Sequence, residues 1–358
     1  MNGTAEARGH EAVATLYHAY ITGFILTVTT RAGTRQAEDF WFAVFRRQHL
    51  DLFLAGLKKL GLEDLPDAVK AAQYHYLSNR VAGVKVEYMY ESDTKAWVRF
   101  VPPRWVYDGA AICGVPGSVS RALLRGWYGH NGVALGNPRL GFVCTAQTMD
   151  GQHGLAGYFR EYDHDLGPDE RLVFSPGEQP PPFDAAAAPD FDADAWPPER
   201  LGKANRNYSM NFTRALLGQS AALFGPAEAA YYGGITGQLI GMQFYDRTKA
   251  LLGVSGDDAA AFARYLAAMA RAQDDRAEIE TVGDAVHVRQ YGWRVMRGMR
   301  DIPDCAFDAW NGLWRGALTA HNRFLVLEVL QRLDYGDDCI EWRIRRRASA
   351  ASSTAPSG

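Results

Sequence analysis

Residues 84–101 read VKVEYMYESDTKAWVRFV, and this stretch decides the fold class. Between residues 84 and 90, apolar residues alternate with mostly charged ones, which is the two-residue period of a strand with one buried face. Ser92 and Asp93 are typical turn residues, and residues 97–101 return as the partner strand. The stretch therefore predicts an antiparallel hairpin.

Helical patterns lead into this hairpin. Between residues 11 and 61, apolar residues recur at spacings of three and four, and Gly61 is the predicted stop. A second helix is predicted to start after Pro66 and to run from Asp67 to Arg80. After the hairpin, the sequence predicts a further helix and a second strand pair, over residues 118–128, 140–148 and 157–162.

The second half of the chain repeats this order of elements. Helices, a hairpin, a helix and a strand pair are predicted over residues 208–223, 257–272, 286–299, 307–318 and 324–344, with a Gly-rich run at 233–241 between the first two helices. Arg125-Gly126 precedes His130-Asn131, and Arg315-Gly316 precedes His321-Asn322, at matching places in the two halves. The shared order and the shared string predict a duplication.

The sequence therefore predicts an α+β protein built from two helices-plus-antiparallel-hairpin domains. The first repeat covers residues 11–167 and the second covers 201–347. Residues 168–200 form a Pro/Ala-rich linker, and the Ser/Ala tail at 348–358 is expected to be disordered.

Composition limits the class of protein. The chain has 358 residues, 47% of them hydrophobic and 22% charged, with a net charge of -3, so neither a membrane-embedded chain nor a nucleic-acid-binding protein is indicated. The four cysteines form no Cys-x-x-Cys pair, the N-terminus carries no apolar export signal, and the apolar stretch 20–28 is too short to span a bilayer. We expect a cytoplasmic protein with no membrane partner.

The closing strand pair carries a family resemblance. Val326-Leu327-Glu328-Val329, followed by the run from Gly336 to Trp342 with Cys339 inside it, resembles the end of vinyl-reductase-type ligand-binding domains. Their superfamily includes haem–nitric-oxide-binding domains, vesicle-tethering subunits and the 2-amino-thiazoline-4-carboxylate hydrolase family. The resemblance covers residues 280–345, and 80–165 more loosely. Domains of this superfamily commonly pair, so it implies pairing within the tandem repeat or in a homodimer.

In length and two-half layout, the whole chain is similar to the trans-anethole oxygenase family. These single-component enzymes cleave the propenyl side chain of phenylpropenes to an aromatic aldehyde. The resemblance implies a haem-dependent oxygenase with haem b as cofactor, a small apolar aromatic substrate, and molecular oxygen or peroxide as oxidant. The aromatic content, with 9 Trp, 17 Tyr and 17 Phe, suffices for the walls of such a pocket as well as for the core.

His75 is the candidate axial ligand, because haem–nitric-oxide-binding domains also carry their proximal His on a helix just before the sheet. Tyr76, Ser78 and Arg80 follow it and resemble the Tyr-x-Ser-x-Arg string that binds the haem propionates in that family. In the family, this string lies well downstream of the proximal His. His49, on an aromatic helical stripe, is the second candidate, and a core role remains open for both histidines.

His130 and Arg139 are the candidate catalytic groups, as a distal acid/base and its charged neighbour. Since the His-Asn pair recurs at residue 321, a plain helix C-cap is the alternative for His130.

Two other functions stay open. A small-ring hydrolase like the 2-amino-thiazoline-4-carboxylate enzyme would use a cysteine, with Cys144, Cys305 and Cys339 as candidates, or a water activated by a histidine. A non-catalytic small-molecule or haem sensor would need only the pocket.

Overall fold

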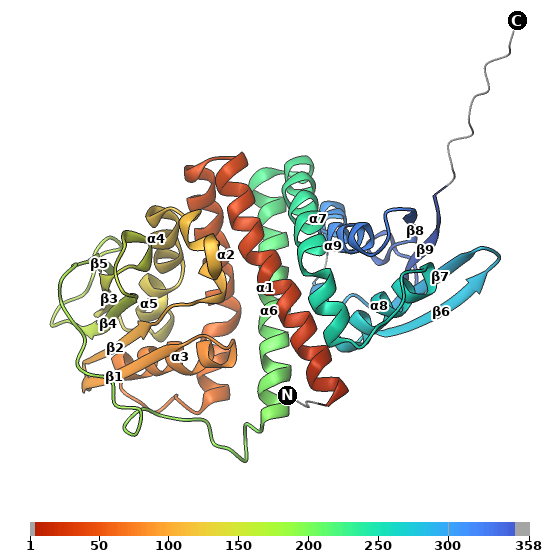
Figure 1. The fold of residues 1–358 in the computed structure, drawn as a ribbon. Helices are drawn as coiled ribbons and strands as arrows, with labels where there is room; N and C mark the ends of the chain where they lie inside the picture. Colours follow the sequence, from red (N-terminus) through yellow and green to blue (C-terminus); the bar gives the residue numbers. More distant parts are fainter. Residues whose placement is uncertain (1–3, 300, 348–358) are drawn as a thin grey trace, which may run out of the picture.

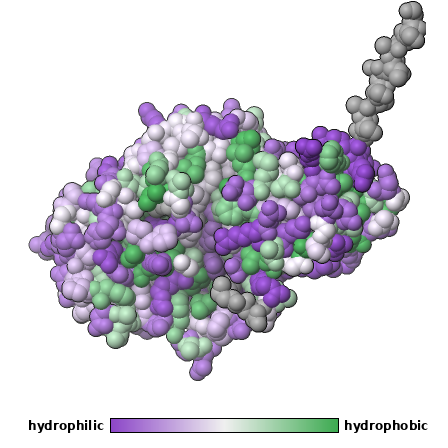
Figure 2. All heavy atoms as spheres, viewed as in Figure 1, coloured by the Kyte–Doolittle hydropathy of each residue, from purple (hydrophilic) through white to green (hydrophobic). Residues whose placement is uncertain are grey.

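The computed structural model describes residues 4–299 and 301–347, so the tail predicted to be disordered lies outside the described residues. The predicted α+β class is confirmed: long helices occupy the middle of the molecule and a separate sheet lies at each end (Figure 1). Hydrophobic and hydrophilic residues are interspersed on the face shown in Figure 2.

The first half follows the predicted order of elements. Its elements are α1 (Ala5–Arg31), α2 (Thr34–Leu60), α3 (Asp67–Val81), β1 (Val86–Ser92), β2 (Lys95–Phe100), α4 (Gly117–Gly126), α5 (Asn131–Leu135), β3 (Leu140–Ala146), β4 (Leu155–Glu161) and β5 (Leu172–Phe174). The helical stretch predicted as one unit is two helices, because Gly33 between them has φ +101 and ψ 165, a conformation open only to glycine. Gly61 ends α2 in the left-handed conformation, as predicted.

The second half has the same order. Its elements are α6 (Pro198–Phe224), α7 (Pro226–Leu251), α8 (Ala259–Ala272), β6 (Arg276–Val282), β7 (Ala285–Tyr291), α9 (Asp304–His321), β8 (Leu325–Gln331) and β9 (Ile340–Arg346). The strand orders also agree, β1-β2-β4-β3 followed by β5 in one sheet and β6-β7-β9-β8 in the other. The order of β1 to β4 therefore matches the order of β6 to β9, whereas β5 has no counterpart, and the duplication stays a prediction.

Two predicted elements of the second half were wrong. The Gly-rich run at 233–241 is not a connection but the middle of the helix α7. The hairpin predicted at 286–299 lies ten residues earlier at its start, over β6 and β7, because the turn is made at Gly283 (φ +63). Residues 294–296 form a short 3-10 turn instead of a strand.

The first helix of each half packs against the other half. In α1, the Tyr17 hydroxyl bonds to Gln273 Oε1 at 2.8 Å and receives the Trp310 indole N–H at 2.8 Å. In α6, the Phe212 ring contacts Phe45 and Trp105, with centroids 5.3 and 5.4 Å apart. The two helices therefore form a shared central layer, visible between the sheets in Figure 1.

Helix α1 is also the one helix in the described ranges that is long and apolar enough to cross a membrane. However, 67% of its most apolar window is buried inside the protein. Its apolar character thus matches its place between the two halves.

Glycines bring α7 and α9 into close contact. On α7, Gly237 and Gly241 face the backbone of α9, and a Cβ at Gly241 would lie 2.1 Å from the Leu313 carbonyl oxygen. On α9, a Cβ at Gly316 would lie 2.1 Å from the Gln238 carbonyl oxygen. Side chains larger than hydrogen are therefore excluded at this helix crossing.

The segment predicted as a linker covers the outer face of the first sheet. Its short strand β5 pairs in parallel with β3, and Phe183 packs on a small apolar cluster, Met89, Trp97, Val143 and Tyr158. The outer face of the second sheet carries ion pairs instead, among them Glu328 with Arg343 at 2.6 Å.

Candidate functional site

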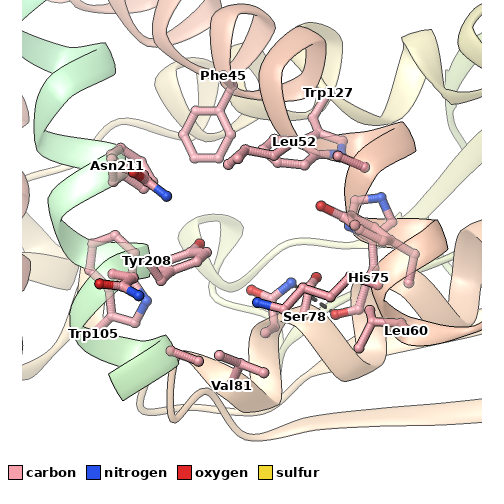
Figure 3. A pocket seen from close by; sticks show the side chains of 18 of the residues that line it. Phe45, Leu52, Leu60, His75, Ser78, Val81, Trp105, Trp127, Tyr208 and Asn211 are labelled. Atoms are coloured by element: carbon pink, nitrogen blue, oxygen red, sulfur yellow. Dashed lines mark hydrogen bonds between the residues drawn. The ribbon is translucent and has the colours of Figure 1, made fainter. Parts of the chain in front are cut away.

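A cavity of about 240 Å³ lies in the first half, between α2, α3, α6 and the connection at residues 104–106. Phe45 and Trp127 lie on one side of it, and Tyr208 and Trp105 lie opposite (Figure 3). Aromatic side chains dominate the wall: Phe45, Tyr74, Trp105, Trp127, Tyr128, Trp196, Tyr208 and Phe212. Such a wall favours apolar and aromatic ligands.

The cavity reaches the surface beside α2. Ala55 and Lys59 line it and are exposed, and the Lys59 ammonium lies 5.1 Å from the centre of the Trp196 ring. Partial burial lowers the pKa of Lys59, with the nearby Arg200 as a second cause. The entrance is thus formed by the Lys59 side chain and the Trp196 indole, and the Arg200 guanidinium also lies 4.3 Å from the centre of that indole.

The polar lining is sparse and comes mainly from α3 and α6. Ser78 and Asn79 belong to α3, whereas Asn207 and Asn211 lie one turn apart on α6. Arg104 also lines the cavity, and its guanidinium lies 4.5 Å from the centre of the Phe100 ring. A few polar groups in an apolar wall can orient a ligand without making the site hydrophilic.

His75 lines the inner end of the cavity and is almost fully buried. Asn131 Nδ2 lies 3.0 Å from His75 Nε2 and donates a hydrogen bond to it. The imidazole stacks on Tyr128 with centroids 3.9 Å apart, and the Tyr74 and Trp127 rings stand edge-on at 5.5 and 6.0 Å. Burial lowers the pKa of His75 well below its usual value, so the ring is neutral at neutral pH.

His49, unlike His75, does not line the cavity. Arg46 Nη1 donates to His49 Nδ1 at 2.8 Å, and burial together with the Arg46 charge lowers the pKa of His49 to about 3. Its ring also stacks on Phe53 at 5.0 Å. His49 therefore belongs to the aromatic core of α2, the alternative that the sequence left open.

Haem held by His75 would need a free imidazole nitrogen that faces open space. His75 Nε2 is already bonded to Asn131, and aromatic rings surround the imidazole at 3.9 to 6.0 Å. In this arrangement His75 does not offer Nε2 to a haem iron.

Two of the three residues expected at the propionates lie outside the cavity wall. Ser78 lines the cavity, but Tyr76 and Arg80 do not. Arg80 pairs with Asp190 at 2.9 Å and lies 5.1 Å above the Tyr76 and Phe191 rings. Arg80 therefore anchors the segment between the halves.

The two candidate catalytic residues lie outside the cavity wall. His130 is half-buried at the end of the turn after α4, where its Nδ1 donates to the Arg125 carbonyl at 2.9 Å. Arg139 is exposed and pairs with Glu161 on β4. The structure brings His130 close to His49, with ring centroids 6.2 Å apart, but it does not bring His130 and Arg139 together in one hydrogen-bonded group.

Sequence reasoning missed the contribution of α6. Asn207, Tyr208, Asn211 and Phe212 form a whole wall of the cavity, yet they lie in the second half of the chain. Their spacing of three and four residues places them on one helical face, which the sequence alone could have indicated. Trp196, in the predicted linker, was also missed, because the other residues of the cavity wall are remote from it in sequence.

In the ranges 4–299 and 301–347, no group of three or more His, Cys, Asp and Glu side chains gathers as a metal site would require.

No family model and no curated protein matches the sequence. Among solved structures, the chain is similar to a trafficking protein particle complex subunit 3 from Naegleria fowleri covalently bound to palmitic acid. That alignment has 16% identity and a TM-score of 0.31, and it covers 38% of this chain and 95% of the other.

Proposed function

We propose that this chain binds a small, predominantly apolar and aromatic molecule in the cavity between α2, α3 and α6. The observation that carries the proposal is the wall itself, in which eight of the 23 lining residues are Phe, Tyr or Trp. Burial of apolar ligand surface there contributes about 25 cal/mol per Å². A volume of about 240 Å³ suits a ligand of up to three aromatic rings.

The polar lining adds orientation. Ser78 and the amides of Asn207 and Asn211 offer donors and acceptors on opposite walls. The neutral His75 adds little charge to this space, since its Nε2 is already engaged. These groups support binding with a defined ligand orientation.

The probe for this proposal is N-phenylnaphthylamine, a neutral aromatic dye that fluoresces in apolar surroundings. Ala204 lines the cavity, so Ala204→Phe fills it and should abolish the fluorescence increase. The matched control is Ala222→Phe on an exposed position of the same helix, which should bind as the unmodified protein does. Equal binding by both variants would refute the cavity as the binding site.

The haem-dependent oxygenase stays a prediction. It would require an axial ligand other than His75 in its present arrangement, or release of His75 from Asn131. A visible absorption spectrum of the purified protein, with and without added haemin, tests it directly. A Soret band that persists in His75→Ala would keep haem and reject this ligand, whereas a colourless protein that takes up no haemin would reject the oxygenase.

The hydrolase prediction has less support from the cysteines. Burial raises the pKa of Cys144 to about 12, and it also raises the pKa of Cys305 and Cys339. These three thiols are thus protonated at neutral pH and weak nucleophiles, and none of them lines the cavity.

A further inference from the structure

A second cavity, also of about 240 Å³, lies beside the aromatic one on α6. Asn207 and Asn211 line both cavities, so their two side-chain amides form the ridge between them. The rest of the second cavity is lined by Met210, Arg214, Arg294 and Arg297. Three guanidinium groups thus surround a space that adjoins the aromatic cavity.

These arginines are only partly neutralised: Asp51 acts on Arg214, and Asp274 and Asp275 act on Arg294. In the part of the chain that the structure describes, neither Arg214 nor Arg294 has a carboxylate within ion-pair distance. Arg214 donates instead to the Arg297 carbonyl at 2.9 Å and to Asn211 Oδ1. Arg297 has one acidic contact, Asp275 at 3.4 Å, and Asp275 also accepts from Gln290 Nε2 and the Arg294 backbone N–H.

The electrostatic environment disfavours the positive charges as they stand. Burial lowers the pKa of Arg214, and burial together with repulsion from Arg297 lowers the pKa of Arg294. Arginine nevertheless stays charged at neutral pH, so the unfavourable desolvation and charge repulsion persist in the folded protein. A bound anion would relieve both the desolvation and the repulsion, and it could accept forked hydrogen bonds.

We infer that the ligand of the aromatic cavity carries an anionic group, a carboxylate, sulfonate or phosphate, which Arg214, Arg294 and Arg297 bind in the adjoining cavity. The aromatic body lies between α2, α3 and α6, and the anionic group passes the Asn207–Asn211 ridge. This inference rests on the proposed function and specifies its ligand class as aromatic acids.

Two dyes with the same aromatic body test the two proposals separately. Anilinonaphthalene sulfonate carries an anionic group, whereas N-phenylnaphthylamine is neutral. With the full chain, Arg214→Gln and Arg294→Gln should each weaken binding of the sulfonate about tenfold, the effect of one charge-assisted hydrogen bond. Binding of the neutral dye should not change, which also verifies that each variant is folded.

Matched variants control for the charge itself. Arg247→Gln removes one positive charge from an exposed position on α7 and should leave both dyes unaffected. Arg294→Lys keeps the charge but loses the fork, so it should recover part of the sulfonate affinity. Added salt should weaken binding of the sulfonate and not of the neutral dye.

The outcomes separate failure of the two proposals. If Ala204→Phe leaves the binding of the neutral dye intact, the aromatic cavity is not the binding site and both proposals fall. If Ala204→Phe abolishes that binding but the sulfonate binds equally well to Arg214→Gln and Arg294→Gln, only the anionic site is overturned. A loss of sulfonate binding confined to Arg104→Gln would place the anion in the main cavity and would also overturn it.

Discussion

The two halves of the chain share their order of elements and their strand order, but they fill the space beside their third helix differently. In the second half, α1 inserts Tyr17 beside α8, and its hydroxyl links Gln273 and Trp310. In the first half, α6 presents Tyr208 and two asparagines beside α3, and a cavity remains. The two exchanged helices thus differ: the tyrosine of α1 is hydrogen-bonded in the core, whereas side chains of α6 form one wall of a cavity.

In the second half, the glycines of α7 and α9 bring the two helix backbones into close contact. Gly241→Ala should lower the free energy of unfolding by about 2–4 kcal/mol, because its Cβ would lie 2.1 Å from a backbone oxygen that cannot move freely. Urea unfolding measures this. The control is Gly202→Ala on α6, where nothing lies within 4 Å of the added Cβ; it should stabilise by up to about 1 kcal/mol.

Removing one tyrosine hydroxyl from each exchanged helix compares the core site of Tyr17 with the cavity site of Tyr208 directly. Tyr17→Phe leaves the buried Trp310 N–H and Gln273 oxygen without their partner, which should cost about 1–3 kcal/mol. Tyr208→Phe at the cavity should cost less than about 0.5 kcal/mol, since no residue in the described ranges bonds to its hydroxyl. Equal losses in thermal unfolding would contradict the difference between the halves.

Acidification should weaken the first half through its buried neutral histidines. His49 has a folded-state pKa of about 3, below the ordinary value of 6.5, so the unfolded chain takes up the proton first. Stability from this site is therefore complete above about pH 6.5 and should fall by about 1 kcal/mol towards about pH 5.5. His49→Gln should remove that share of the pH dependence in urea titrations. Its unfolding at neutral pH provides the control, as it measures the packing change alone.

Substitutions on the outer faces of the two sheets should have the smallest effects on stability. Phe183→Ala removes a ring from the small apolar cluster over the first sheet and should cost about 1 kcal/mol, with faster proteolysis of the covering segment. Glu328→Gln breaks half-buried surface pairs with Arg343 and Arg345 on the second sheet and should change stability by no more than a few tenths of a kcal/mol. A larger effect of Glu328→Gln would reverse this ranking.

Much of the local structure was predictable because it depends on neighbours in the chain. The alternation in β1 and the stop at Gly61 both follow from backbone preferences and periodicity. Helix α7 was missed because glycine disfavours helices in isolation, whereas here close contact with α9 compensates for that preference.

The candidate site was predictable only in part. His75 and Ser78 do line the cavity, but His130, Arg139, Tyr76 and Arg80 do not. The patterns that suggested these four residues are short strings on one segment. A site wall, however, is assembled from segments far apart in the chain, and strings carry no information about that assembly.

By itself, the sequence determined the α+β class, the order of the main elements and the approximate places of β1 to β4, since periodicity and turn residues act over a few positions. Only the tertiary structure decided that α1 and α6 each pack against the opposite half, because the free energy of burying their faces depends on which surfaces are available. This packing places Tyr17 of α1 in the core of the second half and makes α6 a wall of the cavity in the first half.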